Sequence, residues 1–428
     1  MKVAYITAGA GGMLCGTCLH DNSLAAALKR AGHEVALIPL YTPIRTDEQD
    51  VSMHRVFYGA VNVYLRTRSP LAHRLLGPLA RLLDRPGVLA WASKRGTSID
   101  PRELGALTLS VLRGEDGQQR GELQSLVGWL RDTFRPDVVH LSHTLFIGLA
   151  REIRRGVAVP VVCSVQGEDL FLDGLVEPFR GDARRLLRER VGDVDRLVAT
   201  CNDYAGWMAE YLGVGRDRLT VVPLGINLRG HEADPVEPPP PFTVGYLARI
   251  AREKGLHLLV EAVGRLAAQG TPVRLRAAGY LSDPAYLEEV QAQARQLGIE
   301  AAFEYVGEVD RPGKIAFLRS LHAFSVPAIF REPKGLYILE ALASGVPVVE
   351  PHHGAFPELI QETGGGLLAV PDSAEALAAG LRRLRDDPAL RAQLGRNGRA
   401  AVLRGRSDDA MAGTTLALYR AATGAARN

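Results

Sequence analysis

Short apolar runs alternate with longer amphipathic stretches along most of the chain. The short runs are rich in Val, Ile and Leu, which is typical of buried strands: KVAYIT, EVALIPL, PDVVHLS, PVVCSV, RLVAT, LTVVPLG, FTVGYLA, VRLRAAG, FEYVG, AFSVPA and VPVVE. Apolar residues at helical spacing lie between them, for example in residues 22–31 and 255–268. Because strands that alternate with helices form parallel sheets covered on both faces, the pattern predicts an α/β fold.

The alternation stops once, in the segment RGHEADPVEPPPP at residues 229–241, and restarts at Phe242. Consecutive prolines join neither a helix nor a strand ladder, so this segment is expected to be a stiff linker. A chain of 428 residues also exceeds what one core usually supports. We therefore predict two doubly wound domains, residues 1–228 and 242–407. Ligands bind at the carboxyl ends of the strands in such sheets, which predicts a site in a cleft between the domains.

Composition excludes several classes of function. The net charge of +3 is too small to indicate nucleic-acid binding. Four cysteines are too few for a disulfide scaffold and fit a reducing, cytoplasmic compartment. The first predicted strand is too short for a signal peptide, and no run of about 18 apolar residues predicts a membrane span. We expect a cytoplasmic enzyme.

Residues 63–95 depart from the alternating pattern, because leucines are mixed there with arginines and lysine against a single aspartate. Such a stretch can lie on an anionic membrane surface, which would place the enzyme peripherally at the inner face of the membrane. The alternative is a helical insertion that packs its leucines on the first domain. Pro70, Pro78 and Pro86 interrupt any long amphipathic helix and favour the insertion.

The segment FREPKGLYILEALASGVPVVE contains two glutamates, Glu332 and Glu340, separated by seven residues. Helical spacing predicts a helix over residues 336–344, ended by Gly345, with Glu332 in the loop before it. The first turn of a helix leaves backbone amides free to face an anion. Carboxylates suit hydroxyl groups and amides suit phosphate, so the segment predicts a nucleotide-sugar site. The alternative is a pair of solvated surface glutamates.

Two cations follow the predicted strand FTVGYLA, in the sequence RIAREKG. Arg249 and Lys254 lie on the loop that enters the next helix, where they are well placed for a diphosphate. Arg252 and Glu253 between them are interpreted as solvent-exposed residues. A lone Arg/Lys pair is weak evidence for a phosphate site. This pair, however, occupies a position in the order of strands and helices that matches the position of the two glutamates.

The loop GAGGMLCGTCLH after the first strand is open to three interpretations. Its glycines suit a phosphate-binding loop, the pair Cys15 and Cys18 suits a redox dithiol, and His20 adds the elements of a metal site. Gly11 and Gly12 allow a phosphate to approach the backbone closely. We favour the phosphate loop, with Cys15 on the acceptor side of the site and Cys18 packing the helix.

These residues together resemble the GT-B-fold glycosyltransferases of family 4, which are retaining nucleotide-sugar enzymes. The resemblance covers nearly the whole chain and includes RAGHEV, RPDVVHLSH, RLVAT, VVPLGIN, YLARIAREKG, YVGEV and FSVPAIFREPKGLYILEALASGVPVVEPHHGAFPEL. It implies the GT-B fold: two Rossmann-like doubly wound domains that face a central cleft. It also implies that a closing helix in residues 408–428 crosses back to the first domain.

The resemblance implies roles for matching positions. Arg249 and Lys254 resemble the pair that neutralises the donor diphosphate, and Glu340 resembles the glutamate that binds the ribose hydroxyls. Glu332 resembles the glutamate beside the donor sugar ring, which acts as nucleophile or as electrostatic partner. Other donor contacts are implied for the backbone of Gly335, Leu336 and Tyr337 and for the loop residues Gly11 and Gly12.

Two positions depart from the family's pattern. The usual histidine of a His-Gly pair is replaced by Gln166 in SVQGEDLF, which can hydrogen-bond but cannot take a proton. His143, Glu168 and Asp169 are candidates to compensate on the acceptor side. Lys334 stands where an aromatic residue is common, and either pairs with Glu332 or an anionic sugar or is solvated. We favour the solvated interpretation.

The resemblance implies a retaining glycosyltransferase that uses a nucleoside-diphosphate sugar, with UDP or GDP as the nucleotide and an unidentified acceptor. No cofactor is implied, and no metal, because the cations are side chains. The alternatives are a non-transferring GT-B enzyme such as a UDP-sugar 2-epimerase, or a nucleotide-sugar-binding protein without turnover. A nicotinamide-dependent oxidoreductase is disfavoured because GAGGMLCG lacks the G-x-G-x-x-G spacing.

Overall fold

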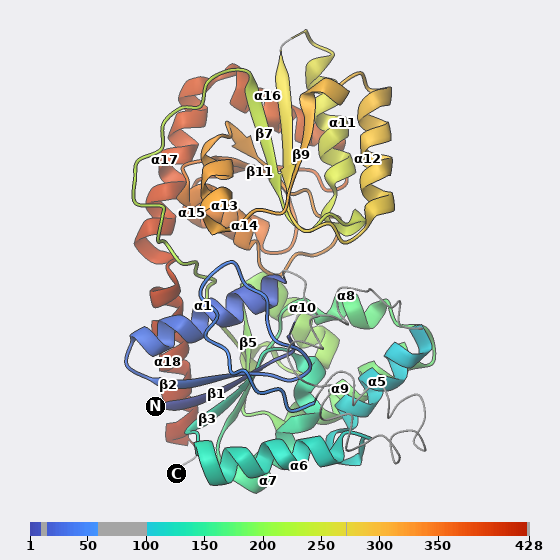
Figure 1. Cartoon of the computed structure of the whole chain (residues 1–428), viewed down its shortest axis with the longest axis vertical. Coiled ribbons are helices and arrows are strands. Elements are labelled where there is room, and N and C mark those ends of the chain that lie inside the picture. Colours follow the sequence, from blue (N-terminus) through green and yellow to red (C-terminus); the bar gives the residue numbers. More distant parts are fainter. Residues whose placement is uncertain (10–14, 59–100, 271, 426–428) are drawn as a thin grey trace. The chain divides into compact units, whose positions relative to one another are not determined.

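The computed structural model describes residues 1–9, 15–58, 101–270 and 272–425. Gly11, Gly12 and the basic segment 63–95 lie outside the described residues. The chain divides into two compact units, of which unit 1 comprises Met1–Pro223 with Met411–Asn428 and unit 2 comprises Leu224–Ala410. Within these described residues, each unit contains one sheet of six parallel strands flanked by helices (Figure 1). The prediction of a two-domain, Rossmann-like α/β fold is confirmed.

The sheet of unit 1 has the order β2-β1-β3-β4-β5-β6. Its strands are β1 (Lys2–Thr7), β2 (Glu34–Pro39), β3 (Val138–Leu141), β4 (Val161–Ser164), β5 (Arg196–Ala199) and β6 (Leu219–Val221). The chain passes from β1 to β2 on one side and then returns to add β3 on the other. The connections after β1 and β3 therefore leave the sheet in opposite directions, and folds of this type bind ligands at the carboxyl ends of such a pair of strands.

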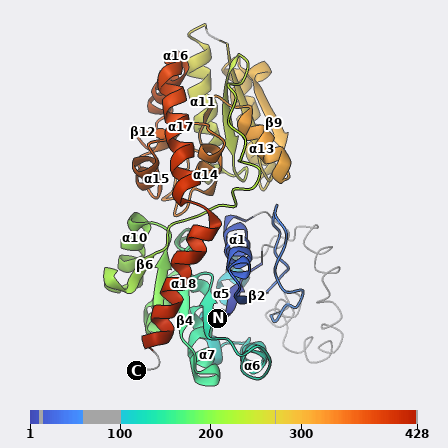
Figure 2. The same cartoon turned by 90° about the vertical axis from the view of Figure 1, so that its left-hand side faces the viewer.

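The main helices of unit 1 are α1 (Gly16–Arg30), α5 (Pro101–Arg113), α6 (Arg120–Trp129), α7 (Ala150–Val157), α8 (Glu168–Asp173), α9 (Phe179–Arg190), α10 (Asn202–Leu212) and α18 (Asp408–Ala425). Helix α18, drawn in red in Figure 2, comes from the other end of the chain. Its side chains Met411, Leu416 and Tyr419 join Val3 and Tyr5 of β1 in one buried core. Apolar burial of this kind stabilises unit 1 with residues from both chain ends.

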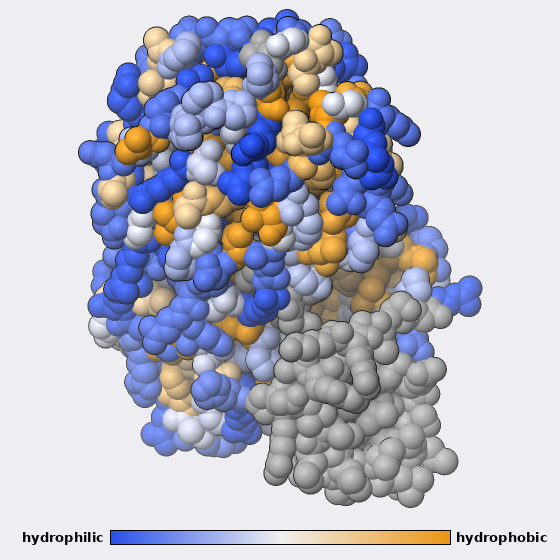
Figure 3. Space-filling view, turned by 45° about the horizontal axis from the view of Figure 1, so that its top comes forward, coloured by the Kyte–Doolittle hydropathy of each residue, from blue (hydrophilic) through white to orange (hydrophobic). Residues whose placement is uncertain are grey.

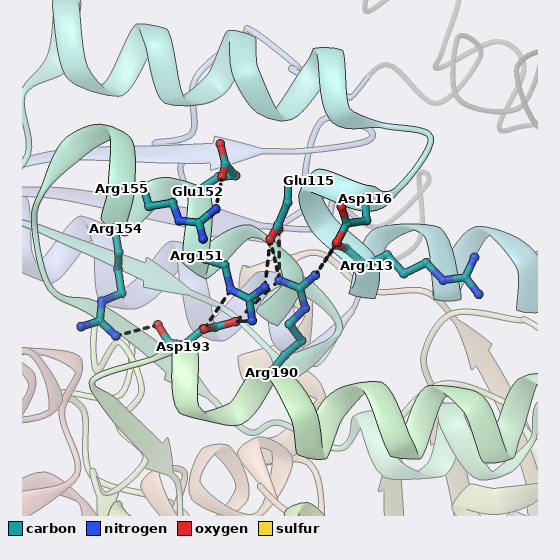
Figure 4. Close-up of polar contacts among 9 residues, drawn as sticks. All are labelled: Arg113, Glu115, Asp116, Arg151, Glu152, Arg154, Arg155, Arg190 and Asp193. Carbon is teal, nitrogen blue, oxygen red and sulfur yellow. Dashed lines mark hydrogen bonds and ion pairs between the residues drawn. The ribbon is translucent and has the colours of Figure 1, made fainter.

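An ion-pair cluster ties together the helices on one side of unit 1 (Figure 4). Arg190 of α9 is 5% exposed and its guanidinium contacts the Glu115 carboxylate at 3.0 Å. Arg151 of α7 contacts Glu115 at 3.1 Å and Asp193 at 3.1 Å. A buried guanidinium is unfavourable without partners, and here the carboxylates of Glu115 and Asp193 balance the charges of Arg190 and Arg151. The cluster therefore has a structural role.

The sheet of unit 2 has the order β12-β11-β10-β7-β8-β9. Its strands are β7 (Phe242–Leu247), β8 (Val273–Ala278), β9 (Phe303–Gly307), β10 (Ala323–Phe324), β11 (Val348–Pro351) and β12 (Gly366–Ala369). Numbered within the unit, this is the order 6-5-4-1-2-3 of dinucleotide-binding folds. The strand order reverses between β7 and β10, which pair in parallel. The rule for such sheets puts a ligand outside the carboxyl ends of these two strands.

The helices of unit 2 are α11 (Leu256–Ala267), α12 (Pro284–Gln296), α13 (Arg311–Arg319), α14 (Leu336–Ala343), α15 (Phe356–Thr363), α16 (Ala374–Asp386) and α17 (Pro388–Gly405). All predicted strands are found, although AFSVPA is reduced to Ala323–Phe324. Strand β12 was missed, because GLLA begins with the last of three consecutive glycines and is too short to predict. The helix predicted over residues 22–31 begins earlier, at Gly16.

Residues 229–241 form no helix or strand. They are attached to unit 2 by Arg399 of α17, whose guanidinium donates to the carbonyls of His231 at 2.7 Å and Glu232 at 3.1 Å. The same side chain also donates to the carbonyl of Ala343 at 2.6 Å, at the end of α14. Arg399 is 8% exposed, so its charge is offset by these carbonyl dipoles.

The surface of the described residues mixes apolar and polar side chains, as the face shown in Figure 3 illustrates. Isolated exposed apolar residues such as Val370, at 66% exposure, are normal on a protein surface. None of the helices in the described ranges has both the length and the apolar character needed to span a bilayer.

Candidate active site

The predicted catalytic residues of unit 2 follow the two strands at the switch point. Arg249 and Lys254 lie after β7, and Glu332 lies after β10. The two loops are joined by the amide of Ile329, which donates to the carbonyl of Glu253 at 3.0 Å. Lys254 and Glu332, 78 positions apart in the sequence, are thereby brought to one edge of one sheet, as the sheet topology requires.

Lys254 and Glu332 form an ion pair in a nearly buried setting. The Lys254 ammonium contacts Glu332 Oε2, and the Tyr337 hydroxyl donates to the same oxygen at 3.2 Å. Glu332 is 6% exposed, so burial raises the pKa of its carboxyl, but the Lys254 charge and hydrogen bond outweigh burial and leave the pKa below its ordinary value. Lys254 also lies 4.8 Å from the ring centroid of Phe330. The site therefore holds an ionised carboxylate beside a cation.

The backbone of Glu332 is fixed by the loop after β11. The amide of Ala355 donates to the Glu332 carbonyl at 2.8 Å. Gly354 has a φ of 60°, and a Cβ at this position would lie 2.5 Å from the Glu332 carbonyl oxygen. A side chain at position 354 would therefore push the loop that carries Glu332, which explains why glycine is needed there.

A second carboxyl group, missed by the sequence analysis, is buried near this pair. Glu350 of β11 has no exposed surface and accepts the amide of Val326 at 3.1 Å. Burial raises the pKa of Glu350 well above its ordinary value, and the Glu332 charge raises it further against the opposing effects of the Val326 amide and Lys254. The raised pKa favours the protonated form of Glu350 next to the ionised Glu332, as expected for two nearby carboxyl groups.

Glu350→Gln is expected to make the free energy of unfolding less sensitive to pH. Above the ordinary glutamate pKa the unfolded chain loses a proton that the folded wild type keeps, so wild-type stability falls as pH rises. The free energy of unfolding of the variant, relative to that of the wild type, should therefore increase by about 1.4 kcal/mol per pH unit until the pH reaches the pKa of Glu350 in the folded state. Urea unfolding between pH 5 and pH 8 measures this difference. Glu375→Gln, at an exposed position on α16, is the control and should show no such growth.

Glu340 and Lys314 form a second carboxylate–ammonium pair. Glu340 lies in the middle of α14, where the sequence predicted it, and contacts the ammonium of Lys314 from α13. Lys314 is 7% exposed and was missed, although a lone lysine before the apolar run IAFL was a usable signal. A cation held at this depth orients the Glu340 carboxylate.

Arg249 is more exposed than Lys254. Its guanidinium contacts the Glu253 carboxylate, and the Arg249 side chain is 40% exposed. The interpretation of Glu253 as a residue that faces only solvent is therefore incomplete, because it holds Arg249. Arg252, as expected, is a surface residue, 56% exposed and paired with Glu289.

Helix α14 begins at Leu336, as predicted, after Gly335 in the left-handed conformation with a φ of 78°. Gly335 has no side chain to cap the helix. The backbone amides of Leu336 and Tyr337, in the first turn of α14, therefore have no acceptor within the helix. The interpretation of Lys334 as solvated is wrong. Lys334 is 7% exposed, and its charge helps to lower the pKa of Glu332. Three cations and a helix N-terminus therefore surround this edge of the sheet.

In unit 1 the predicted residues follow β1, β3 and β4. Gln166 lies after β4, is 6% exposed, and donates from Nε2 to the carbonyl of Ser142 at 2.7 Å. Glu168 at the start of α8 accepts hydrogen bonds from the Thr144 hydroxyl at 2.6 Å and from the backbone amide of Gln166 at 2.6 Å. Glu168 thus braces the loops after β3 and β4. Asp169 has a similar role, because it accepts the Tyr204 hydroxyl at 2.6 Å.

His143 and the two cysteines near the first helix lie among packed side chains. The His143 ring lies 4.2 Å from the ring of Phe146, centroid to centroid. Cys18 is 2% exposed in the core of unit 1, and Cys15 packs against the same core at the start of α1. The four cysteines, all in the described ranges, form no disulfide. No group of three or more metal-binding side chains is found in the part of the chain that the structure describes.

Substitution of the cysteines is expected to change activity by no more than a few-fold. Cys18 fills a core position that alanine can occupy, whereas serine would bury a hydroxyl, so the variant of choice is Cys15→Ser with Cys18→Ala. The activity of this variant and of the wild type should not respond to reductant or EDTA. Loss of activity in a folded double variant that still binds nucleotide would assign the chemistry to a thiol or a metal.

Two families of proteins match most of the chain. Residues 20–225 match the glycosyl transferase 4-like domain, and residues 231–401 match glycosyl transferases group 1. A glycogen synthase of Mycobacterium tuberculosis is 29% identical over 300 residues, which are 68% of this chain and 70% of that protein. A D-inositol 3-phosphate glycosyltransferase of Pseudarthrobacter chlorophenolicus is 28% identical over 407 residues, 85% of this chain and 90% of the relative.

Solved structures of glycosyltransferases have the same fold. Sucrose-phosphate synthase from Thermosynechococcus elongatus superposes with a TM-score of 0.73 at 19% identity and covers 99% of each chain. HepE of Anabaena in complex with UDP gives a TM-score of 0.66 at 16% identity, over 98% of this chain and 100% of HepE. The family matches, the relatives and the fold agree: this chain belongs to the GT-B glycosyltransferases of the family 4 type and is an enzyme of that class.

Proposed function

We propose that the enzyme transfers a sugar, with retention of configuration and without a metal ion, from a UDP-sugar to a hydroxyl-bearing acceptor. The observation that carries the proposal is the Lys254–Glu332–Tyr337 cluster at the switch point of unit 2. A cation, an ionised carboxylate and a helix N-terminus at one sheet edge match the phosphate, the sugar and the leaving group of such a donor. UDP is favoured over GDP because HepE is a structural neighbour in complex with UDP.

The donor roles are divided between two groups of side chains. Lys254 and Arg249 neutralise the diphosphate and stabilise the negative charge that develops on the leaving group. The Glu340 carboxylate, held by Lys314, accepts hydrogen bonds from the ribose hydroxyls. The amides of Gly335, Leu336 and Tyr337 at the start of α14 complete the anion contacts of unit 2.

Glu332 stabilises positive charge that develops on the sugar as the bond to the diphosphate breaks. Its pKa lies below the ordinary value, so the carboxylate is ionised at neutral pH and ready for this role. The raised pKa of Glu350 favours its protonated form, which adds no second negative charge near Glu332. The leaving phosphate oxygen takes the proton of the acceptor hydroxyl on the same face of the sugar, which accounts for retention.

The acceptor is assigned to unit 1. Gln166 offers a hydrogen bond to the substrate in place of a histidine. Cys15, after β1, and His143, after β3, are proposed to lie with it on the acceptor side of the site. Glu168 braces the loops after β3 and β4 rather than contacting the acceptor, because both of its oxygens already accept hydrogen bonds.

A thermal-shift screen with UDP, GDP, ADP and their sugars tests the proposal. A ligand at 100 times its Kd stabilises the folded state by about 2.7 kcal/mol, which is readily seen as a rise in Tm. UDP and a UDP-sugar should give the largest rise, with no change on addition of EDTA. Turnover of that sugar nucleotide, followed by NMR of the anomeric product, tests retention. Binding without turnover on any acceptor would favour a nucleotide-sugar-binding protein, and no rise with any nucleotide would contradict the proposal.

A further inference from the structure

A buried carboxylate that the proposed mechanism does not use lies next to Gln166. Asp21 of α1 has no exposed surface. Its Oδ1 accepts the Tyr5 hydroxyl at 2.9 Å and Gln166 Nε2 at 3.2 Å, and its Oδ2 accepts the Thr7 hydroxyl at 2.7 Å. His20 Nδ1 lies 3.1 Å from Oδ1. Burial raises the pKa of Asp21, but these contacts, led by His20, outweigh burial and keep the pKa below its ordinary value.

The carboxamide of Gln166 fits this environment in one orientation only. Its Nε2 faces two acceptors, the Asp21 carboxylate at 3.2 Å and the Ser142 carbonyl at 2.7 Å. A rotation of the amide by 180° would bring Gln166 Oε1 against both of these acceptors, with no donor between them. An ionised Asp21 makes that orientation especially unfavourable, because like partial charges would meet in a low-dielectric interior.

The other end of the amide, Gln166 Oε1, is buried and accepts no hydrogen bond from the described residues. An unpaired buried acceptor costs about 1–3 kcal/mol, so such an atom is expected where a ligand supplies the missing donor. Gln166 lies at the carboxyl ends of the strands of unit 1, next to Ser142 after β3. This is the edge of the sheet where ligands bind in folds of this type.

We infer that Asp21 is a positioning residue, which holds Gln166 Nε2 toward α1 so that Oε1 remains as the acceptor for a hydroxyl group of the substrate. The inference rests on the proposed function, because it assumes that Gln166 faces a substrate. It also defines a specificity. A substrate group at this place must donate a hydrogen bond, as a sugar or alcohol hydroxyl does, and a carboxylate or phosphate is excluded by Oε1 and by the charge of Asp21 behind it.

A double-mutant cycle with Asp21→Asn and Gln166→Glu tests the hydrogen-bond polarity. Q166E brings a second carboxylate against Asp21 and the Ser142 carbonyl, so it should lower the Tm and reduce turnover roughly tenfold or more. D21N in the Q166E background supplies an N–H donor in place of the repelling oxygen. The double variant should therefore recover a substantial part of both losses, although each single substitution is harmful.

Turnover is measured as nucleotide release from UDP-glucose, GDP-mannose or ADP-glucose, whichever raises the Tm most, with water and glucose as acceptors. Gln166→Met, which has neither donor nor acceptor, should lose turnover while it keeps the affinity for the nucleotide, and its Tm should fall less than that of Q166E because no second carboxylate is brought against Asp21. Additive losses in the cycle would show that Asp21 does not hold Gln166. Recovery of the Tm without recovery of turnover, or full turnover in Q166M, would overturn the role of Oε1. No turnover by the wild type would overturn the proposed function, while the Tm cycle would still decide the Asp21–Gln166 contact.

Discussion

Glu332→Gln is expected to reduce kcat by about 10²–10³-fold, the usual loss when a preorganised charge at a reaction centre is removed. The substitution keeps the size of the side chain and an oxygen that can accept the Tyr337 hydroxyl, so it removes little besides the negative charge. That charge is proposed to stabilise the sugar as it becomes positive. The affinity for the nucleotide should stay the same or increase, because Lys254 loses a carboxylate that competes for its ammonium.

Glu340→Gln is the matched control, since Glu340 also pairs with a lysine in the same unit. Here the nucleotide affinity should fall, because the ribose hydroxyls lose charge-assisted hydrogen bonds, while kcat at saturating donor changes less. Calorimetric titration with UDP and initial rates at saturating donor separate the two effects. Both variants need a Tm measurement, because removal of one partner of a buried ion pair destabilises a protein by about 3–5 kcal/mol. The opposite pattern of losses would contradict the assignment of the two glutamates.

The fold could be predicted from sequence because its signals are local. Each strand of the two sheets except β12 is a compact apolar run, and in the described residues most of them are followed by a helix with its own periodicity. The sites after β7 and β10 could also be predicted, because a Rossmann-like sheet brings the ends of these two strands together once the order of strands is known. The positions of Arg249, Lys254 and Glu332 could be predicted from that rule and from the motifs in which they occur.

What the sequence could not predict depends on neighbours that are distant in the chain. Glu350 is the last residue of the run VPVVE and resembles a polar strand end, but it has no exposed surface and accepts the amide of Val326, which follows β10. Lys334 follows a proline in a loop and looks solvated, yet it is buried. The orientation of Gln166 is set by Asp21, which is 145 residues away in sequence. Periodicity carries no information on such pairs.

Lys254→Met is expected to weaken binding of nucleoside diphosphates by roughly 1.5–3 kcal/mol, the range for hydrogen bonds to charged groups. Methionine keeps the aliphatic length that packs over the Phe330 ring, so the loss should come from the charge. Arg249→Ala should have an effect in the same direction. Arg252→Ala is the matched control, because this exposed arginine on the same loop pairs with Glu289 and has no proposed contact with phosphate. The corresponding nucleoside should bind equally well to all four proteins.

The Lys254 variant should also move the pH dependence of kcat, which separates it from a simple loss of binding. Burial raises the pKa of Glu332, and the Lys254 charge and hydrogen bond are the main effects that lower it. Without Lys254 the pKa of Glu332 should rise, so the carboxylate becomes protonated at a higher pH. Activity should therefore begin to fall at a higher pH in the variant than in the wild type as the solution is acidified. Rates at saturating donor from pH 4 to pH 8 measure the shift, and Lys254→Arg should restore most of the wild-type profile because it returns the positive charge. An unchanged acidic limb in Lys254→Met would show that Lys254 does not act on Glu332. An equal loss of affinity for nucleoside and nucleotide would show that it does not act on the diphosphate.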